Sequence, residues 1–296
     1  MEPDHVLKPG MPEYERGQRL RARVISAEPH ICIERARLVT EAYLEHGHED
    51  IYTLRAKAFD RVLRGIRVYI LDDELIAGHQ ASRQRSAPLF PEFAVQWIID
   101  ELDSLNVRPQ DRFVVTDEVK EEFKEVIYPF WKGRTFGDRL QSYLTENIRL
   151  QRYAATVFTV GCHEEQGLGH VALDYEKVLR KGLAGIKNEI EERSAVLFIW
   201  KPADYKKKLF YESCLTIADS VIAFARRYAA RARELAGLER EEGRKRELLR
   251  IAANCERVPE HPARTFHEAL QSLWFVQLIP QIYDNGVSIS DRKSVV

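Results

Sequence analysis

Hydrophobic residues recur every three to four positions along most of the chain, which predicts a largely helical protein. The strongest pattern lies between residues 211 and 256, where two helices are expected on either side of Gly237. The first places these apolar side chains on one face: Cys214, Ile217, Val221, Phe224 and Tyr228. The second carries Leu248, Ile251, Ala252 and Cys255, and its outer face alternates in charge as a solvated surface does.

Weaker helical patterns are expected in four further stretches, namely residues 21–43, 53–64, 93–105 and 117–131. Pro129 lacks an amide hydrogen and should interrupt or end the last of them. A final helix is expected from Phe266, followed by Pro280 and an extended tail. Residues 1–20 have no such pattern and are expected to form a flexible tail.

Strands are expected to be few and short. The run Val68–Leu71 is rich in β-prone residues and is followed by a predicted turn at Asp72 and Asp73. Residues 74–92 combine Gly, Ser, Pro and two arginines without periodicity, which predicts an irregular loop.

The stretch FTVGCHEEQGLGHVALDYEKVLRKG, residues 158–182, combines a short β-prone run, a polar loop and a helix start. Asp174 suits the N-cap of that helix, and Gly182 is placed to end it. Loops on a rigid scaffold carry much of protein chemistry, so we expect this loop to contribute to a functional site.

Composition narrows the class of protein. The 296 residues are 45% apolar and 31% charged, as in a globular protein with a sizeable core. The 45 Lys and Arg nearly balance the 46 Asp and Glu, so charge gives no reason to expect a nucleic-acid or anionic-membrane partner. No signal peptide or bilayer-length apolar run is visible, and the four cysteines form no C-x-x-C pair, so a cytoplasmic location is expected.

Several residues could have a catalytic, metal-binding or anion-binding role, but for each of them a purely structural role is favoured. The spacing of His163 and His170 is not that of H-E-x-x-H, so no metal site is expected. Cys162 beside His163 could be a nucleophile, but a small buried apolar role is favoured. Arg83 and Arg85 could bind an anion, but buried arginines tying irregular backbone together are favoured. The four tryptophans are expected in the core: Trp97, Trp131, Trp200 and Trp274.

Six segments then stand out in order along the chain: ERARLVTEAYLEH (34–46), LRAKAFDRVLRGIRVYILDDELIAGHQASRQRSAPLFPE (54–92), PFWKGRTFGDRL (129–140), GHVALDYEKVLRKGL (169–183), ARTFHEALQSLWFVQLIPQ (263–281) and NGVSIS (285–290). Together they resemble the N-terminal half of glycyl radical enzymes, in the pyruvate formate-lyase-like branch that includes glycerol and diol dehydratases. The resemblance covers residues 21–290, with residues 291–296 as an atypical end.

The resemblance implies a predominantly helical α/β fold, the N-terminal portion of a ten-stranded α/β barrel that is incomplete here. In the full-length parent a cysteine loop and a C-terminal glycine loop meet inside the barrel. The glycine stores a radical that an activase installs with S-adenosylmethionine and an iron–sulfur cluster. The resemblance also implies a small-molecule substrate and a homodimer for the full-length protein.

Both radical loops lie beyond this sequence in the family pattern, so no catalytic residue is assigned and the isolated chain is expected to be inactive. Cys162 in G-C-H-E is superficially similar to the radical cysteine motif, but it precedes the DYEKVL helix, which is the wrong place. After NGVSIS the family continues with a Gly-Arg-Phe-Asp-type segment, whereas this chain reads DRKSVV. A truncated or frameshifted gene, or a cloned fragment, is therefore expected.

The resemblance assigns two substrate-binding positions and two weaker ones. His170 matches a histidine that contacts substrate hydroxyls in the glycerol dehydratase-like members, and Ser288 matches a serine that reaches the pocket. His163 and Gln166 are candidates for the pocket wall. Val287 stands where those dehydratases have histidine, which argues against glycerol because a buried substrate hydroxyl would lose its partner.

The resemblance therefore predicts an N-terminal fragment of a dehydratase or related C–X lyase that acts on a small polar substrate. It would supply substrate-binding groups and no radical chemistry. One alternative is a C–C lyase on a 2-oxo acid, similar to formate acetyltransferase. A second is a non-catalytic helical fragment of a broken gene.

Overall fold

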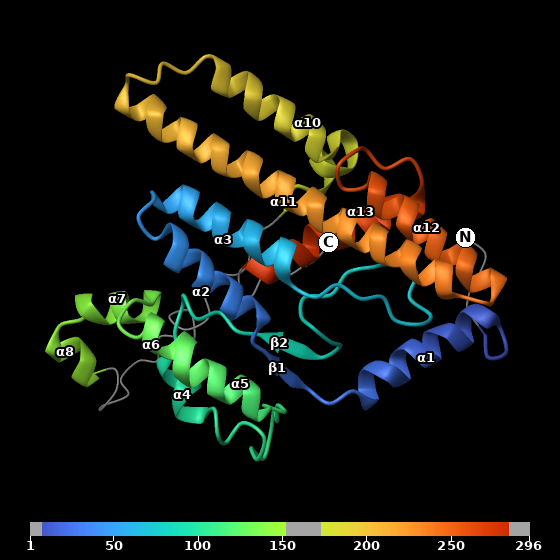
Figure 1. The fold of residues 1–296 in the computed structure, drawn as a ribbon, viewed down its shortest axis with the longest axis horizontal. Coiled ribbons are helices and arrows are strands. Elements are labelled where there is room, and N and C mark those ends of the chain that lie inside the picture. Colours follow the sequence, from blue (N-terminus) through green and yellow to red (C-terminus); the bar gives the residue numbers. More distant parts are fainter. Residues whose placement is uncertain (1–7, 152–172, 284–296) are drawn as a thin grey trace, which may run out of the picture.

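A computed structural model describes residues 8–151 and 173–283 of the chain. Helices dominate it, and one small parallel sheet lies among them (Figure 1). The helices are α1 (Pro12–Ser26), α2 (Glu34–His46), α3 (Ile51–Gly65), α4 (Gln96–Glu101), α5 (Asp117–Glu122), the π-helical turn η1 (Phe123–Ile127), α6 (Tyr128–Trp131), α7 (Phe136–Tyr143), α8 (Glu146–Arg149), α10 (Tyr175–Ala195), α11 (Pro202–Leu238), α12 (Glu242–Arg257) and α13 (Phe266–Tyr283). The strands are β1 (His30–Cys32) and β2 (Ser86–Pro88).

The long helix α11 organises the core. It packs against α3, α10 and α12, and Figure 1 shows it crossing much of the molecule. The face predicted from its periodicity is the buried one, since Val221, Phe224 and Tyr228 all lie in the core. The Tyr228 ring packs 5.1 Å from Phe224 and 5.8 Å from Phe275 of α13, measured between ring centroids. The apolar periodicity of this region therefore predicted its packing correctly.

The sheet is parallel and was not predicted where it lies. β1 pairs with β2, with His30 opposite Ser86, and His30 also bridges Val114 in parallel. β1 interrupts the stretch predicted as one helix over residues 21–43, because Pro29 disfavours helical backbone just before it. β2 lies inside the stretch predicted as an irregular loop.

Two other local predictions are also wrong. Val68–Leu71 forms no strand, because its backbone pairs with no neighbouring strand in residues 8–151 and 173–283. The turn predicted after it is present, and Asp73 has a φ of 69°. The predicted N-terminal tail of residues 1–20 contains most of α1, which begins at Pro12, a favoured residue at a helix start.

Pro129, Pro280 and Gly182 were expected to interrupt or end helices, but in the structure the helical backbone continues past each of them. Pro129 cannot donate to the carbonyl of Glu125, and the turn before it widens into η1 before α6 continues to Trp131. Pro280 lies inside α13, which runs on to Tyr283, and the extended tail expected over residues 284–290 lies outside the described residues. Gly182 has a φ of 65° and kinks α10, which continues to Ala195. The predicted fold class, a predominantly helical α/β fold, is confirmed.

Candidate functional site

The four predicted substrate-binding residues lie outside the described part of the chain. His163, Gln166 and His170 fall within residues 152–172, and Ser288 falls within residues 284–296. Cys162 falls in the first of these stretches too. The structure therefore describes the helices that flank the two predicted segments.

The flanking helices α10 and α13 are directly joined. The Asp174 side chain accepts a hydrogen bond of 3.0 Å from the Lys177 amide and caps α10 as predicted. The next residue, Tyr175, donates its hydroxyl hydrogen to Oε1 of Gln277 on α13. Gln277 is 1% exposed, and burial raises the pKa of Tyr175, so the hydroxyl stays protonated as a donor. The start of α10, which follows the segment of His170 in sequence, thus lies against α13, which precedes the segment of Ser288 in sequence.

A second contact fixes α10 at its kink. The Leu183 amide donates to the Pro259 carbonyl at 2.8 Å, and the Ala184 amide donates to the Glu260 carbonyl at 2.9 Å. A Cβ atom on Gly182 would lie 2.3 Å from that Glu260 carbonyl oxygen. Only glycine fits this close approach with a positive φ, so the kink attaches α10 to the turn between α12 and α13.

Arg35 of α2 holds the other flank, the C-terminal end of α13. Its Nε donates to the Ile282 carbonyl at 2.6 Å and its Nη2 to the Tyr283 carbonyl at 2.9 Å. The last carbonyls of a helix have no partner within the helix, and a cation there also offsets the helix dipole. Arg35 is 3% exposed and forms a bidentate ion pair with Glu92, which balances its buried charge.

The same guanidinium ties in the segment that follows β2. It donates to the Leu89 carbonyl at 3.1 Å and lies 3.9 Å from the centroid of the Phe90 ring. Sequence reasoning did not single out Arg35. The sequence did contain a sign of its role, because Arg35 lies on the apolar face of α2, between Ile33 and Ala36. An unpaired charge buried at such a position would be costly.

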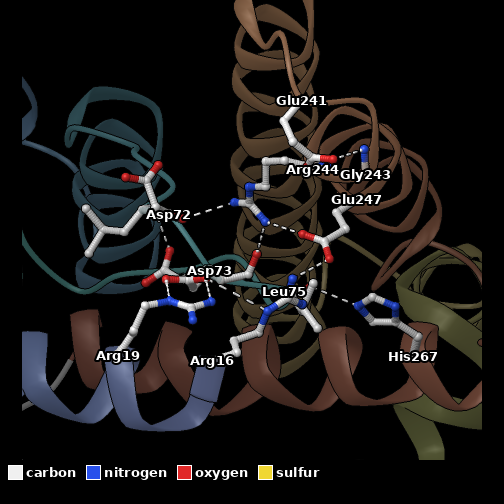
Figure 2. Close-up of polar contacts among 12 residues, drawn as sticks. Arg16, Arg19, Asp72, Asp73, Leu75, Glu241, Gly243, Arg244, Glu247 and His267 are labelled. Atoms are coloured by element: carbon white, nitrogen blue, oxygen red, sulfur yellow. Dashed lines mark hydrogen bonds and ion pairs between the residues drawn. The ribbon is translucent and has the colours of Figure 1, made fainter. Parts of the chain in front are cut away.

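Residues 71–75 are held by a network of charged side chains (Figure 2). Arg19 of α1 donates to both carboxylate oxygens of Asp73, at 3.0 and 2.6 Å. This hydrogen bonding lowers the pKa of Asp73. Arg16, also on α1, binds Glu247 of α12 at 2.5 Å. The predicted tail is therefore docked onto the rest of the chain by its arginines.

Helices α12 and α13 complete this network from the other side. Arg244 donates to the carbonyls of Leu71 and Glu74 at 3.1 and 2.8 Å, and His267 contacts the Leu75 carbonyl at 2.8 Å (Figure 2). Side chains thus donate hydrogen bonds to the backbone carbonyls of this segment, which in a sheet would accept from the amides of a neighbouring strand. The irregular segment is fixed although it forms no strand.

The predictions for the arginines and tryptophans singled out in the sequence agree with the structure only in part. Arg85 donates to the Ala27 carbonyl at 2.9 Å and ties irregular backbone, as favoured, but both Arg83 and Arg85 are exposed and not buried. Trp131 is buried and donates to Thr40, whereas the core prediction for Trp200 is wrong, since it is 74% exposed. Trp274 is 37% exposed, and its indole N–H donates to the Gly78 carbonyl.

A family model described as pyruvate formate lyase-like matches residues 11–293. The chain belongs to the pyruvate formate lyase-like family. Its fold is similar to that of the glycerol-bound B12-independent glycerol dehydratase from Clostridium butyricum, at 38% identity and a TM-score of 0.90 over 93% of this chain. It is also similar to a glycyl radical enzyme from Archaeoglobus fulgidus, at 31% identity and a TM-score of 0.81 over 93% of this chain.

Among curated relatives, the probable dehydratase YbiW of Escherichia coli (strain K12) is 37% identical over 269 residues, which are 91% of this chain. This chain covers 33% of YbiW and 35% of each of the two solved structures. It therefore spans about a third of the length of the pyruvate formate lyase-like relatives it matches. This is consistent with the N-terminal part of a glycyl radical enzyme and with a partial barrel.

Over residues 8–151 and 173–283, no helix is long and apolar enough to cross a membrane. In the same ranges, no group of three or more His, Cys, Asp or Glu side chains is arranged to hold a metal ion.

Proposed function

We propose that this chain is the substrate-binding N-terminal part of a glycyl radical dehydratase or related C–X lyase acting on a small polar substrate. The family membership supports this, as do the dehydratases among its relatives. The observation that carries the proposal is the hydrogen bond between Tyr175 and Gln277, because it brings together the flanks of the two segments assigned to substrate binding.

In this proposal His170 and Ser288 contact the substrate, and His163 and Gln166 line the pocket wall. Arg35 and Gly182 act as positioning residues, since each fixes the helix from which one of these segments extends. Val287 in place of a histidine favours a substrate other than glycerol, because a buried hydroxyl without a partner is costly.

The radical chemistry belongs to the rest of the proposed full-length enzyme. A glycyl radical there supplies hydrogen-atom abstraction from the substrate, and a radical S-adenosylmethionine activase with an iron–sulfur cluster is the proposed partner. We further propose a homodimer and a cytoplasmic location for the full-length enzyme. The described cysteines Cys32, Cys214 and Cys255 are free thiols, which fits a reducing compartment.

The test uses the full-length enzyme, activated anaerobically, with His170→Ala and Ser288→Ala variants. We expect each to lower kcat/KM for the native substrate by about a hundredfold or more, because a buried substrate hydroxyl loses its partner. The glycyl radical signal in electron paramagnetic resonance should be unchanged. His48→Ala is the matched control, since His48 is exposed beyond α2. Normal turnover and affinity in His170→Ala would refute the assignment.

A further inference from the structure

A cavity of about 160 Å³ lies between α2, α3 and the end of α13. Aromatic side chains form much of its wall: Phe59, Phe93, Phe136 and Tyr283. Small-molecule sites are typically apolar hollows with a few convergent polar groups, and this one is smaller and more open than most, since its lining residue Phe136 is 47% exposed. Among the described residues, its charged groups are Arg35, Glu92 and Arg55, and Tyr43 and Tyr283 add hydroxyls.

The charges in this cavity do not cancel. Arg35 and Glu92 form a bidentate ion pair and neutralise each other. Arg55 has no carboxylate within ion-pair distance over residues 8–151 and 173–283, and its guanidinium lies 4.8 Å from the centroid of the Tyr283 ring. The described residues of the lining therefore carry a net charge of about +1 at neutral pH.

Tyr43 provides a neutral donor in the same cavity. Its ring packs 4.8 Å from Trp131, which fixes its orientation. Burial raises the pKa of Tyr43 to about 12, so its hydroxyl is protonated at neutral pH. That hydroxyl forms no hydrogen bond within the described part of the chain. An acceptor in the cavity would satisfy it.

We propose that this cavity binds a small monocarboxylate with an apolar body. Arg55 and the Tyr43 hydroxyl bind the carboxylate, and the aromatic wall contacts the body. A dianion such as phosphate fits less well, because the Glu92 carboxylate remains nearby and only one cation among the described lining residues is unpaired. The two groups that bind the carboxylate, Arg55 and Tyr43, differ from the residues to which the proposed function assigns substrate contact.

The experiment measures binding of benzoate to the 296-residue chain by equilibrium dialysis, with benzamide as the uncharged probe of the same shape. We expect saturable benzoate binding with a Kd of about 1 mM or tighter, and benzamide binding at least about tenfold weaker. Arg55→Gln should weaken benzoate binding about tenfold or more, and Tyr43→Phe should weaken it to a smaller degree.

Arg64→Gln is the matched control, because it removes one positive charge from the same helix without lining this cavity. It should leave the benzoate Kd within about twofold. The proposal fails if the wild-type chain binds neither benzoate, acetate nor propionate. It also fails if benzamide binds as well as benzoate, or if Arg64→Gln and Arg55→Gln weaken binding equally. None of these results depends on radical activity, so the proposed function is tested separately.

Discussion

The hydroxyl of Tyr175 at the start of α10 donates to the buried side chain of Gln277 on α13, across 102 residues of sequence. This bond lies between the two segments to which the family resemblance assigns substrate binding. It joins α10, which follows residues 152–172, to α13, which precedes residues 284–296.

The Tyr175→Phe substitution removes this hydrogen bond and should lower the stability of the chain. The substitution keeps the ring and leaves the buried Oε1 of Gln277 without this donor, so we expect the free energy of unfolding to fall by about 1–3 kcal/mol. Urea unfolding followed by circular dichroism provides the measurement. Tyr205→Phe is the control, since Tyr205 is 50% exposed, and it should change stability by no more than about 0.5 kcal/mol. Equal stability of the two variants would contradict the prediction.

Gly182 and Gly237 offer a matched pair of glycine substitutions. Gly182→Ala forces a Cβ atom into a positive φ and toward the Glu260 carbonyl, so we expect a loss of about 3 kcal/mol or more. Gly237 lies within α11 with open space where a Cβ atom would be added, and Gly237→Ala should stabilise the chain by about 0.5–1 kcal/mol. Thermal and urea unfolding of both variants would establish the opposite signs. A neutral Gly182→Ala would show that the kink is not constrained.

Arg35 should contribute far more stability than its neighbour Arg37. Arg35→Met leaves Glu92 without this cation and removes the Arg35 hydrogen bonds to the carbonyls of Ile282 and Tyr283, so we expect a loss of about 3–5 kcal/mol. Arg37→Met removes an exposed pair with Glu122 and should cost about 0–1 kcal/mol. Urea unfolding of both variants makes the comparison.

A double substitution separates lost pairing from lost packing around Arg35. Arg35→Met with Glu92→Gln should recover part of the stability, because no carboxylate then remains unpaired. If the double variant is no more stable than Arg35→Met, the unpaired charge is not the cause.

Stability should fall in acid partly through Asp73. Hydrogen bonding from Arg19 lowers the pKa of Asp73 below its ordinary value of 3.8. A carboxyl group whose folded pKa is depressed stabilises the fold above its unfolded pKa, and that stability is lost as pH falls through the folded pKa. Asp73→Asn should therefore be less stable than the wild type at neutral pH, with the difference shrinking below about pH 4. Urea midpoints across this range test it, and a pH-independent difference would contradict the linkage.

The sequence alone determined the features that depend on near neighbours along the chain. The apolar spacing of Val221, Phe224 and Tyr228 predicted the buried face of α11, and Asp174 was correctly identified as a helix cap. Such patterns predict structure because a helix places residues three and four positions apart on the same side. The ordered motifs likewise indicated the family, which the match over residues 11–293 establishes.

Only the tertiary structure decided the features that join distant segments. β1 and β2 are three-residue strands that become strands only by pairing with each other, so no local pattern marks them. Gly182 was recognisable as a special position, but whether it ends or kinks α10 depends on the Glu260 carbonyl beside it. Arg35 and Gln277 acquire their roles from partners far away in sequence, because a buried polar group is stable only where the fold supplies its partner.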